Sequence, residues 1–285
     1  MKHGAKKNFG YQPSFSRRTL RAFCKVIIFI FRLNGRSGIS NEFMQMLDPR
    51  FKTQLEGREL QFRTGNGRLL WRAKTLLTEE PLMISWIKAM SPNDVVLDVG
   101  ANVGIYTVPI AQRAQRVYAC ELDPLNVAIL KENIVLNGVQ QKVTVLPFAC
   151  GRSAELVDVT FRDLAYGDAL QLIDGGEDLG TRLEQLSHTA SIVQFSLDEL
   201  FIQLKLSTHN KIKIDVDGNE ETVLRGLKGL LATANEIYFE DSFTEACKNF
   251  VDFLTKLGFR EKASAEIFST DGTSKLLGFN RIFQK

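Results

Sequence analysis

The sequence predicts an α/β fold with a mostly parallel sheet that helices cover on both faces. From residue 94 onward, short apolar segments rich in β-branched residues alternate with longer segments whose apolar residues recur at helical spacing. Strands separated by helices of this length form βαβ units, which place helices on both sides of a parallel sheet. The composition agrees, because 44% hydrophobic and 24% charged residues in a chain of 285 allow a sizeable core and exclude wholesale disorder.

The expected elements follow one another along this stretch. The clearest is the helix over 124–137, since Pro124 suits its first turn and Gly138 follows its end. The predicted strands are short apolar runs at 94–99, 116–120, 143–148, 156–161, 212–216, 236–240 and 276–283. The predicted helices have apolar residues at helical spacing and lie at 105–113, 124–137, 220–231 and 244–257. The polar, glycine-containing stretch 163–191 contains no expected element.

Three regions are expected along the chain. Residues 1–36 form a basic, partly apolar segment, and residues 37–90 form a small irregular or helical subdomain that ends in a helix near 78–90. Together they make a mostly helical N-terminal appendage. The turn-rich sequence Ser-Pro-Asn-Asp at 91–94 then opens the α/β domain, which is expected to cover residues 91–285.

The N-terminal segment carries an excess of basic charge. Residues 1–36 contain nine Lys and Arg and no acidic residue, so the rest of the chain has a net charge of about −6 although the whole chain has +3. The apolar run at 26–31 is far shorter than the roughly 20 residues of a membrane-spanning helix, and a poor cleavage site follows it. A basic helix with an apolar end suits an anionic membrane surface, and the alternative is a segment that packs on the parent domain or stays partly disordered.

The net charge and the cysteine spacing indicate which compartment and which partners to expect. A net acidic body disfavours a nucleic-acid partner, because phosphate contacts need clustered basic residues. The four cysteines are scattered, with neither a CxxC pair nor zinc-ligand spacing, which suits a reducing compartment. We therefore expect a cytoplasmic protein, with contact between its basic N-terminus and the cytoplasmic face of a membrane as an open alternative.

A glycine-containing turn follows the first strand of the α/β domain. Gly100 and Gly104 permit a tight turn and a close approach of ligand, but the third glycine of a dinucleotide motif is missing. Glu121 ends the next strand, where a carboxylate is able to accept both hydroxyls of a ribose. Asp98 adds negative charge beside the turn, which disfavours a pyrophosphate and suits a cationic group. These residues favour S-adenosylmethionine, which carries an ammonium and a sulfonium, over a nicotinamide dinucleotide.

The motifs around this turn resemble a known family. The stretches concerned are VLDVGANVGIYT at 96–107, YACELDP at 118–124, LKENIVLNG at 130–138, SLDEL at 196–200, IKIDVDGNE at 212–220 and VLRG at 223–226. In combination they resemble the FkbM family of S-adenosylmethionine-dependent methyltransferases. The glycine turn is common to class I methyltransferases in general, whereas the segment from Lys213 to Glu220 narrows the resemblance to this family.

The resemblance implies a class I methyltransferase (Rossmann-like) sheet of seven strands and S-adenosyl-L-methionine as the cofactor. The residues that it implies around the methionine part of the cofactor are Asp98, Gly100, Asn102 and Gly104, with Glu121 on the ribose and Phe148, Ala149 and Cys150 beside the adenine. Family members mostly methylate hydroxyl oxygens, so the acceptor implied is a hydroxyl of a sugar, glycan or secondary metabolite. Asp217 departs from the pattern, because Glu is commoner before the glycine of this segment.

Carboxylates after the fourth strand of the implied sheet are the candidates for catalysis. A hydroxyl is a poor nucleophile until a general base takes its proton, and ligands of open α/β sheets sit at the carboxyl ends of the strands. Asp215 is the first choice for the base or for an acceptor-orienting group. Glu220 is the second, with stabilisation of a helix N-terminus as its alternative, and Glu240 is the third. A Mg²⁺ site at Asp215, Asp217 and Asn219 is a weak alternative, and no metal is expected.

Other polar residues carry weaker signals. His188 falls in the stretch 163–191, which is the expected lid over the acceptor, and either serves as a base or is a solvated loop histidine. Glu79 and Glu80 lie where the resemblance implies an acidic residue on the substrate side, although exposure at the start of a helix is the simpler interpretation.

Two other functions remain open. The region 133–138 is also similar to that of some tRNA methyltransferases, which makes an RNA base methyltransferase an alternative, although the Asn-Pro-Pro-Tyr and Asp-Pro-Pro signatures are missing after the fourth strand. A catalytically silent fold that binds the cofactor and acts as a scaffold is the other. The intact glycine turn and Asp215 argue against it.

Overall fold

The computed structural model describes residues 48–161, 165–169, 172–173, 188–207, 209–216, 219–268 and 276–285, together with residues 19, 22–27 and 29. The chain divides into two compact units, one of Met1–Pro49 and Ser269–Lys275 and one of Arg50–Phe268 and Leu276–Lys285. In the first unit, residues 22–27 are helical, and the rest of the predicted apolar run at 26–31, apart from residue 29, lies outside the described residues. Among the helices that the structure describes, none has the length and hydropathy needed to cross a membrane.

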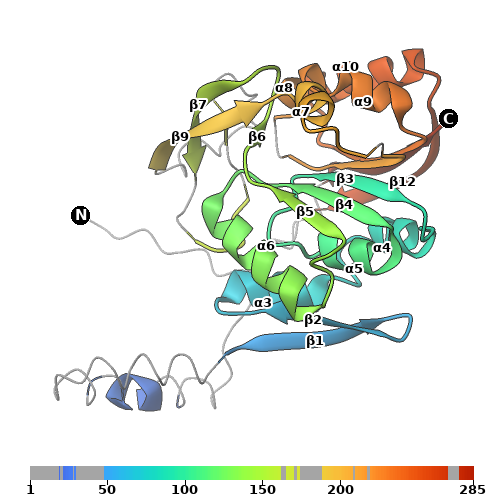
Figure 1. The fold of residues 1–285 in the computed structure, drawn as a ribbon. Helices are drawn as coiled ribbons and strands as arrows, with labels where there is room; N and C mark the ends of the chain where they lie inside the picture. Colours follow the sequence, from blue (N-terminus) through green and yellow to red (C-terminus); the bar gives the residue numbers. More distant parts are fainter. Residues whose placement is uncertain are drawn as a thin grey trace. The chain divides into compact units, whose positions relative to one another are not determined.

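A seven-stranded sheet forms the centre of the second unit (Figure 1). Its strand order is β12-β13-β11-β10-β3-β4-β5. These strands are β3 (Val95–Val99), β4 (Arg116–Cys120), β5 (Val143–Leu146), β10 (Lys211–Ile214), β11 (Glu236–Asp241), β12 (Arg260–Phe268) and β13 (Leu276–Gln284). β13 runs antiparallel to β11 and β12, and the other pairs are parallel. The predicted class, a mostly parallel seven-stranded sheet of the class I methyltransferase type, is confirmed.

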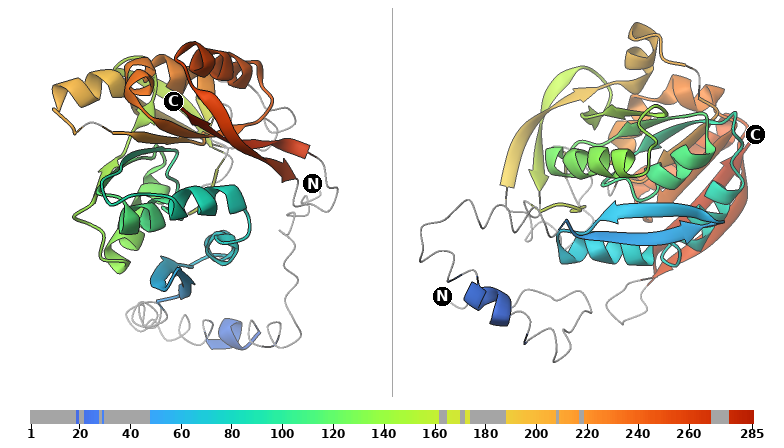
Figure 2. Two further views of the ribbon diagram at one scale, coloured as in Figure 1. Left: turned by 90° about the vertical axis from the view of Figure 1, so that its right-hand side faces the viewer. Right: turned by 60° about the horizontal axis from the view of Figure 1, so that its bottom comes forward.

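Helices cover both faces of this sheet, as Figures 1 and 2 show. One face packs against α4 (Pro81–Lys88), α5 (Thr107–Arg113) and α6 (Pro124–Leu136), and the other against α7 (Leu197–Gln203), α8 (Glu220–Arg225), α9 (Lys228–Thr233) and α10 (Glu245–Lys256). Strand side chains alternate between these layers. In β3, Val96 faces the first layer while Leu97 and Val99 face the second, which explains why this strand reads as a continuous apolar run.

The order of the strands fixes where a ligand sits. From β3 the chain continues outward to β4 and β5, and it then returns to the other side of β3 as β10. Neighbouring strands whose connections leave in opposite directions open a crevice at their carboxyl ends. The loops that follow β3 and β10 border this crevice, and both contain predicted site residues.

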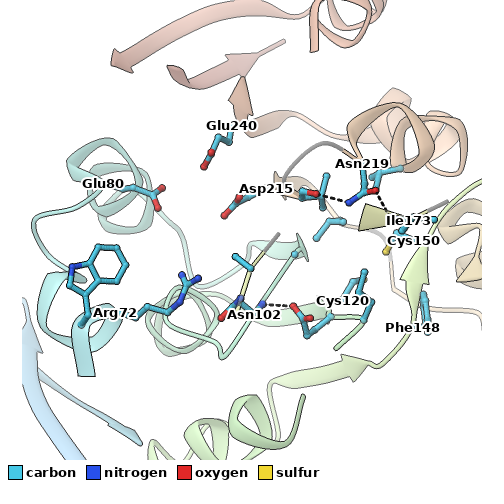
Figure 3. Close-up of a pocket in the computed structure, with 18 residues that line it drawn as sticks. Arg72, Glu80, Asn102, Cys120, Phe148, Cys150, Ile173, Asp215, Asn219 and Glu240 are labelled. Carbon is cyan, nitrogen blue, oxygen red and sulfur yellow. Dashed lines mark hydrogen bonds between the residues drawn. The ribbon is translucent and has the colours of Figure 1, made fainter. Parts of the chain in front are cut away.

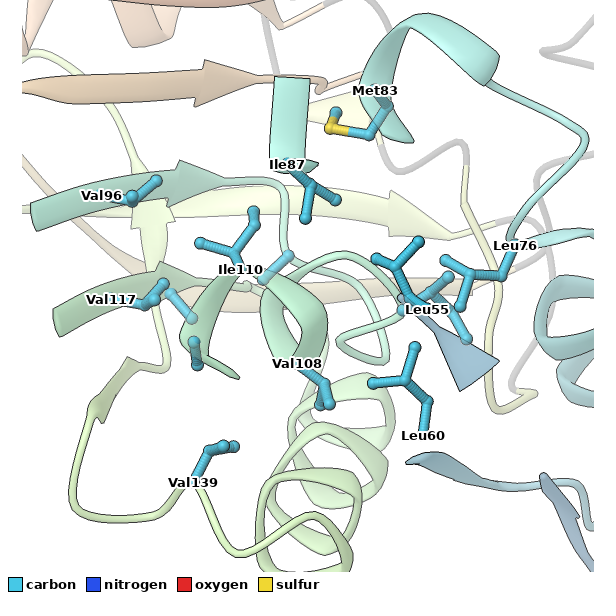
Figure 4. Close-up of a cluster of buried hydrophobic side chains, with 14 of the residues drawn as sticks. Leu55, Leu60, Leu76, Met83, Ile87, Val96, Val108, Ile110, Val117 and Val139 are labelled. Carbon is cyan, nitrogen blue, oxygen red and sulfur yellow. The ribbon is translucent and has the colours of Figure 1, made fainter. Parts of the chain in front are cut away.

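A hairpin and a helix at the start of this unit belong to the same core as the sheet. They are β1 (Arg50–Leu55), β2 (Arg58–Arg63) and α3 (Gly67–Thr75). Leu55 and Leu60 pack in one cluster with Val96 of β3 and Val108 of α5 (Figure 4). A shared cluster of buried side chains does not define where a domain begins or ends. The predicted boundaries at residues 36 and 90 therefore stay predictions.

Two asparagines, one in α6 and one directly after it, attach β2 to the rest of the unit. Asn133 Oδ1 accepts from the Arg63 N–H at 2.9 Å, and its Nδ2 donates to the Val103 carbonyl at 2.8 Å. Asn137 Oδ1 accepts from the Gln61 N–H at 2.9 Å, and its Nδ2 donates to the Gln61 carbonyl at 2.7 Å. Primary amides therefore satisfy backbone groups that a neighbouring strand would otherwise pair. These hydrogen bonds show that the asparagines of the motif at 130–138 hold β2 in place.

A smaller sheet of order β6-β9-β7-β8 lies outside the main one. Its strands are β6 (Ala149–Cys150), β7 (Glu155–Phe161), β8 (Leu172–Ile173) and β9 (His188–Phe195). The sequence predicts no element in the stretch 163–191, but β8 and the start of β9 fall in it. Residues 188–194 of β9 pair with the whole of β7. The predicted helix 220–231 is two helices, and β12 and α7 were not predicted.

We expect Gly100→Ala to destabilise the fold much more than Gly138→Ala. Both glycines have positive φ, +82° and +66°, which costs another residue about 1–2 kcal/mol. A Cβ at Gly100 would also lie 1.8 Å from the Asp215 carbonyl oxygen, whereas none of the described atoms lies within 4 Å of a Cβ at Gly138. Urea unfolding of both variants measures the difference. Equal losses would mean that the loops after β3 and β10 do not approach so closely.

Candidate active site at the carboxyl ends of the strands

The loop after β3 is held in place by the end of β4. The N–H groups of Gly100 and Ala101 donate to the Cys120 carbonyl at 3.1 and 2.9 Å. The next residue, Asn102, has a φ of +50°, and its N–H donates to Glu121 Oε2 at 2.7 Å. Backbone polar groups are thus paired on one side of the loop, and its other side lines a cavity.

Glu121 is a buried carboxylate that borders this cavity. Its Oε1 accepts from the Asp123 N–H at 2.8 Å, opposite the bond from Asn102. Burial raises the pKa of Glu121 to about 7, although these two backbone donors favour the ionised form. Each carboxylate oxygen has a further lone pair, so this group is able to accept hydrogen bonds from a ligand as well.

The cavity beside Glu121 has one apolar and one acidic end (Figure 3). Its volume is about 260 Å³. Phe148, Cys150 and Ile173 lie at the apolar end, and Glu80, Asp215 and Glu240 point into the acidic end. Such a shape fits S-adenosylmethionine, because an adenine needs apolar walls, a ribose needs hydroxyl acceptors such as Glu121, and a sulfonium is favoured near carboxylates.

A second cavity of about 390 Å³ adjoins the first. The residues that line both are Trp71, Arg72, Glu80, Gly100, Asn102, Asp215 and Glu240. Glu79 and the end of β12 near Phe268 line the second cavity alone. The three carboxylates at the acidic end therefore stand where the two cavities meet, with the Arg72 guanidinium beside them (Figure 3).

Lys213 is a buried cation beneath this junction. It is the cross-strand partner of Asp98 in the parallel pair of β10 and β3, and only 2% of its side chain is exposed. Its Nζ lies 3.2 Å from Asp98 Oδ1 and 3.4 Å from Asp215 Oδ2, and it donates to the Gly100 carbonyl at 3.0 Å. Burial disfavours this charge, but Asp98 and Asp215 outweigh burial and raise the pKa of Lys213 above its ordinary value.

Glu80 is held by two tyrosines. Tyr106 Oη donates to its Oε1 at 2.9 Å, and Tyr238 Oη donates to its Oε2 at 3.1 Å. Burial, and next the charge of Asp215, raise the pKa of Glu80 to about 7, against the opposing effects of Lys213 and the two hydroxyls. A carboxyl group with such a pKa in a cavity is a candidate acid or base.

The residues predicted around the cofactor divide into two groups. Gly100, Asn102, Glu121, Phe148 and Cys150 line the first cavity. Asp98, Gly104 and Ala149 do not line either cavity. Asp98 instead accepts from Thr107 Oγ1 at 2.6 Å and pairs with Lys213, and a Cβ at Gly104 would lie 2.5 Å from Leu130 of α6. The roles implied for these residues stay predictions.

The residues predicted to take part in catalysis also differ in whether they line the cavities. Asp215 and Glu240 line both cavities. Glu220 is buried at the start of α8 and lines neither. His188 is an exposed residue at the start of β9 and lines neither cavity. Asp217 lies outside the described residues, and the part of the chain that is described contains no group of three or more His, Cys, Asp or Glu side chains placed to hold a metal ion.

Part of the expected lid borders the first cavity. Ala169 and Ile173 line it, and hydrogen bonds from two asparagine side chains hold the described residues 165–169. The Asp168 carbonyl accepts from Asn102 Nδ2 at 2.7 Å and from Asn126 Nδ2 at 2.9 Å. The glycine turn and this stretch are therefore joined through a single carbonyl oxygen.

Sequence reasoning missed Lys213, Trp71, Arg72, Tyr106 and Tyr238. Lys213 had a signal, because a lysine between two isoleucines of an apolar strand faces the interior and needs a buried anion. The aromatic residues and Arg72 had none, since apolar spacing in a helix or strand indicates only that a side chain is buried.

We expect Lys213→Met to destabilise the protein by about 3–5 kcal/mol, because it leaves the buried Asp98 carboxylate uncompensated. Asp98→Asn in the same chain should restore part of this loss, and urea unfolding of the single and double variants measures it. Lys248→Met is the matched control, since that side chain is 71% exposed in a pair with Glu245. A Lys213→Met variant as stable as this control would contradict the arrangement.

Comparison with known proteins supports a methyltransferase. Residues 68–157 match the profile of the TRM5/TYW2 methyltransferase domain. The hexuronic acid methyltransferase AglP of Haloferax volcanii is 26% identical over 214 residues, which cover 75% of this chain and 82% of that protein. The tRNA (guanine(37)-N(1))-methyltransferase of Phytophthora infestans is 34% identical over 97 residues, which cover 34% of this chain and 23% of that protein.

Among solved structures, the methyltransferase FkbM from Methylobacillus flagellatus overlaps with a TM-score of 0.47 at 12% identity, covering 75% of this chain and 48% of that chain. The profile that matches is thus the TRM5/TYW2 domain rather than the FkbM family that the motifs resemble. Together with the topology and the cavity, the profile and the relatives support an S-adenosylmethionine-dependent methyltransferase.

Proposed function

We propose that this protein is an FkbM-like O-methyltransferase that transfers the methyl group of S-adenosylmethionine to a hydroxyl of a sugar or glycan, with a hexuronic acid as the first acceptor to test. The observation that carries the proposal is the junction of two cavities at Glu80, Asp215 and Glu240. The first cavity suits the cofactor, and the second is large enough to hold a small polar acceptor beside it.

Cofactor binding follows from the walls of the first cavity. Glu121 accepts the ribose hydroxyls, and Phe148 and Ile173 enclose the adenine. The carboxylates at the other end would favour the sulfonium, which carries the methyl group, beside the second cavity. Asp98 acts indirectly, because its pairing with Lys213 fixes the Gly100 carbonyl and hence the course of the loop.

Methyl transfer is an in-line displacement, so the enzyme must align an acceptor oxygen with the methyl group and exclude water. Asp215 is suited to orient the acceptor, since it lines both cavities and 27% of its side chain is exposed. Its pairing with Lys213 holds the carboxylate in one place. Hydrogen bonding from the acceptor hydroxyl to Asp215 then directs the oxygen lone pair toward the sulfonium.

The extent of the similarities favours a sugar over RNA. The TRM5/TYW2 match ends at residue 157, before the loop after β10 that contains Asp215. The similarity to the hexuronic acid methyltransferase covers 75% of the chain, and the net charge of about −6 outside residues 1–36 disfavours an RNA partner. Methylation of a tRNA base is the second candidate, favoured by the profile match. Membrane contact through residues 1–36 and a cytoplasmic location stay proposals.

Calorimetry with S-adenosylhomocysteine tests the cofactor site. We expect Glu121→Ala to weaken binding by about 10- to 100-fold, since it removes hydrogen bonds to a charged acceptor. Glu245→Ala is the control, because Glu245 lies on α10 with an exposed side chain. A folded wild-type protein that fails to bind would contradict the methyltransferase assignment.

Transfer of a radiolabelled methyl group distinguishes the acceptors. We expect labelling of glucuronic acid or galacturonic acid, or of oligosaccharides that contain them, and no labelling of an unmodified tRNA transcript. Label on a guanine of the transcript, lost as salt is raised, would replace the sugar with the second candidate. Cofactor binding without transfer to either class would favour the silent scaffold.

A further inference from the structure

We propose that Glu80, and not Asp215, takes the proton from the acceptor hydroxyl, with Tyr106 and Tyr238 holding its carboxylate at the junction of the two cavities. The inference rests on the proposed transfer to a hydroxyl. It assigns separate tasks to two carboxylates that line the same space.

The geometry places Glu80 where the reacting groups meet. It immediately precedes α4, lines both cavities, and points toward Asp215 and Glu240 (Figure 3). Tyr106 precedes α5 and Tyr238 lies in β11, so two separate elements hold its two oxygens. Each oxygen accepts one tyrosine hydroxyl and keeps a further lone pair for a proton.

Tyr238 also connects Glu80 to the buried charges of the sheet. It is the cross-strand partner of Lys213, which is the partner of Asp98 on its other side. The row Tyr238, Lys213 and Asp98 therefore crosses three neighbouring strands. Tyr238 directs its hydroxyl at Glu80, and Lys213 directs its ammonium at Asp215. The register of the sheet gives each carboxylate a different partner.

These partners give the two carboxylates different tasks. Asp215 is one of the two carboxylates that balance the buried Lys213 cation, so its negative charge is already engaged in that ion pair. Burial and, next, repulsion by Asp215 raise the pKa of Glu80 to about 7, and protonation of Glu80 relieves that repulsion. A base with such a pKa is matched to neutral pH. Glu240 and Arg72 are the other charged groups that line both cavities with Glu80.

The step balances without a further reactant. A lone pair of the acceptor oxygen forms the new bond to the methyl carbon, the bond between sulfur and that carbon breaks, and its electron pair stays on sulfur. The hydroxyl proton moves to Glu80, which later releases it to water. The cofactor loses its positive charge, and the carboxylate loses its negative charge at the same junction.

Proton release on cofactor binding tests the position of Glu80 without any acceptor. Calorimetry at pH 7 in buffers of different ionisation enthalpy measures the protons released. The sulfonium of S-adenosylmethionine favours the ionised form of a nearby carboxyl, so we expect the wild-type protein to release more protons with it than with S-adenosylhomocysteine. Proton release from Glu121 should be the same with both ligands, because both contain the ribose. Glu80→Gln should abolish the difference, and the surface control Glu245→Gln should keep it.

Transfer kinetics with a hexuronic acid acceptor test the chemistry. We expect Glu80→Gln to lower kcat by about 10²- to 10⁴-fold while S-adenosylhomocysteine binding is retained. Glu80→Asp should recover part of the rate. The wild-type kcat should rise with pH through a value below the pKa of about 7 of the ligand-free Glu80 carboxyl, because the sulfonium favours its ionised form. Tyr106→Phe should move this rise to higher pH, because its hydroxyl stabilises the ionised carboxylate.

These experiments distinguish failure of the Glu80 assignment from failure of the proposed function. A Glu80→Gln variant that keeps the wild-type kcat and the wild-type difference in proton release would overturn the assignment of Glu80 while leaving the methyltransferase intact. A Tyr106→Phe variant whose pH profile matches that of the wild type would also overturn it, and this variant covers the case in which Glu80→Gln does not fold. Failure of the wild-type protein to bind either ligand contradicts the proposed function instead.

Discussion

The pairing of Lys213 with Asp98 and Asp215 is the interaction on which the rest of the site depends. A lysine in the middle of a parallel sheet is costly unless anions surround it. Asp98 comes from the neighbouring strand, Asp215 from the loop after the lysine's own strand, and the Gly100 carbonyl from the loop after β3. One ammonium group thus fixes the loops after β3 and β10 relative to each other, and these two loops border the crevice at the switch point of the sheet.

The other parts of the site are attached to this centre by side-chain amides and hydroxyls. Asn102 joins the loop after β3 to residues 165–169, and Asn133 joins α6 to β2. Tyr106 and Tyr238 join Glu80 to the helix and strand on either side of it. Polar groups that are all paired in this way define one arrangement of the loops, because any other would leave buried donors or acceptors unsatisfied.

The charges at the junction suit the chemistry proposed for it. A methyl donor brings a positive charge that disappears in the reaction, and a hydroxyl acceptor gives up a proton. Carboxylates at the junction of the two cavities favour the charged donor over its neutral product, while the buried Lys213 keeps the excess of negative charge small. The small sheet and the β1–β2 hairpin then serve to border or support this space rather than to supply its charges.

The sequence by itself predicted the fold class and the place of the glycine turn, Glu121 and Asp215 at the carboxyl ends of the strands, because strand and helix periodicity and the motifs after strands are local patterns. It did not determine β12, α7 or the start of β9, whose residues are polar or mixed and become strands or helices through pairing and packing. The tertiary structure alone decided that Asp98 pairs with Lys213 and that Glu80 lies at the cavity junction instead of on the surface. Both depend on sheet register and on tyrosines from distant elements, which spacing along the chain does not encode.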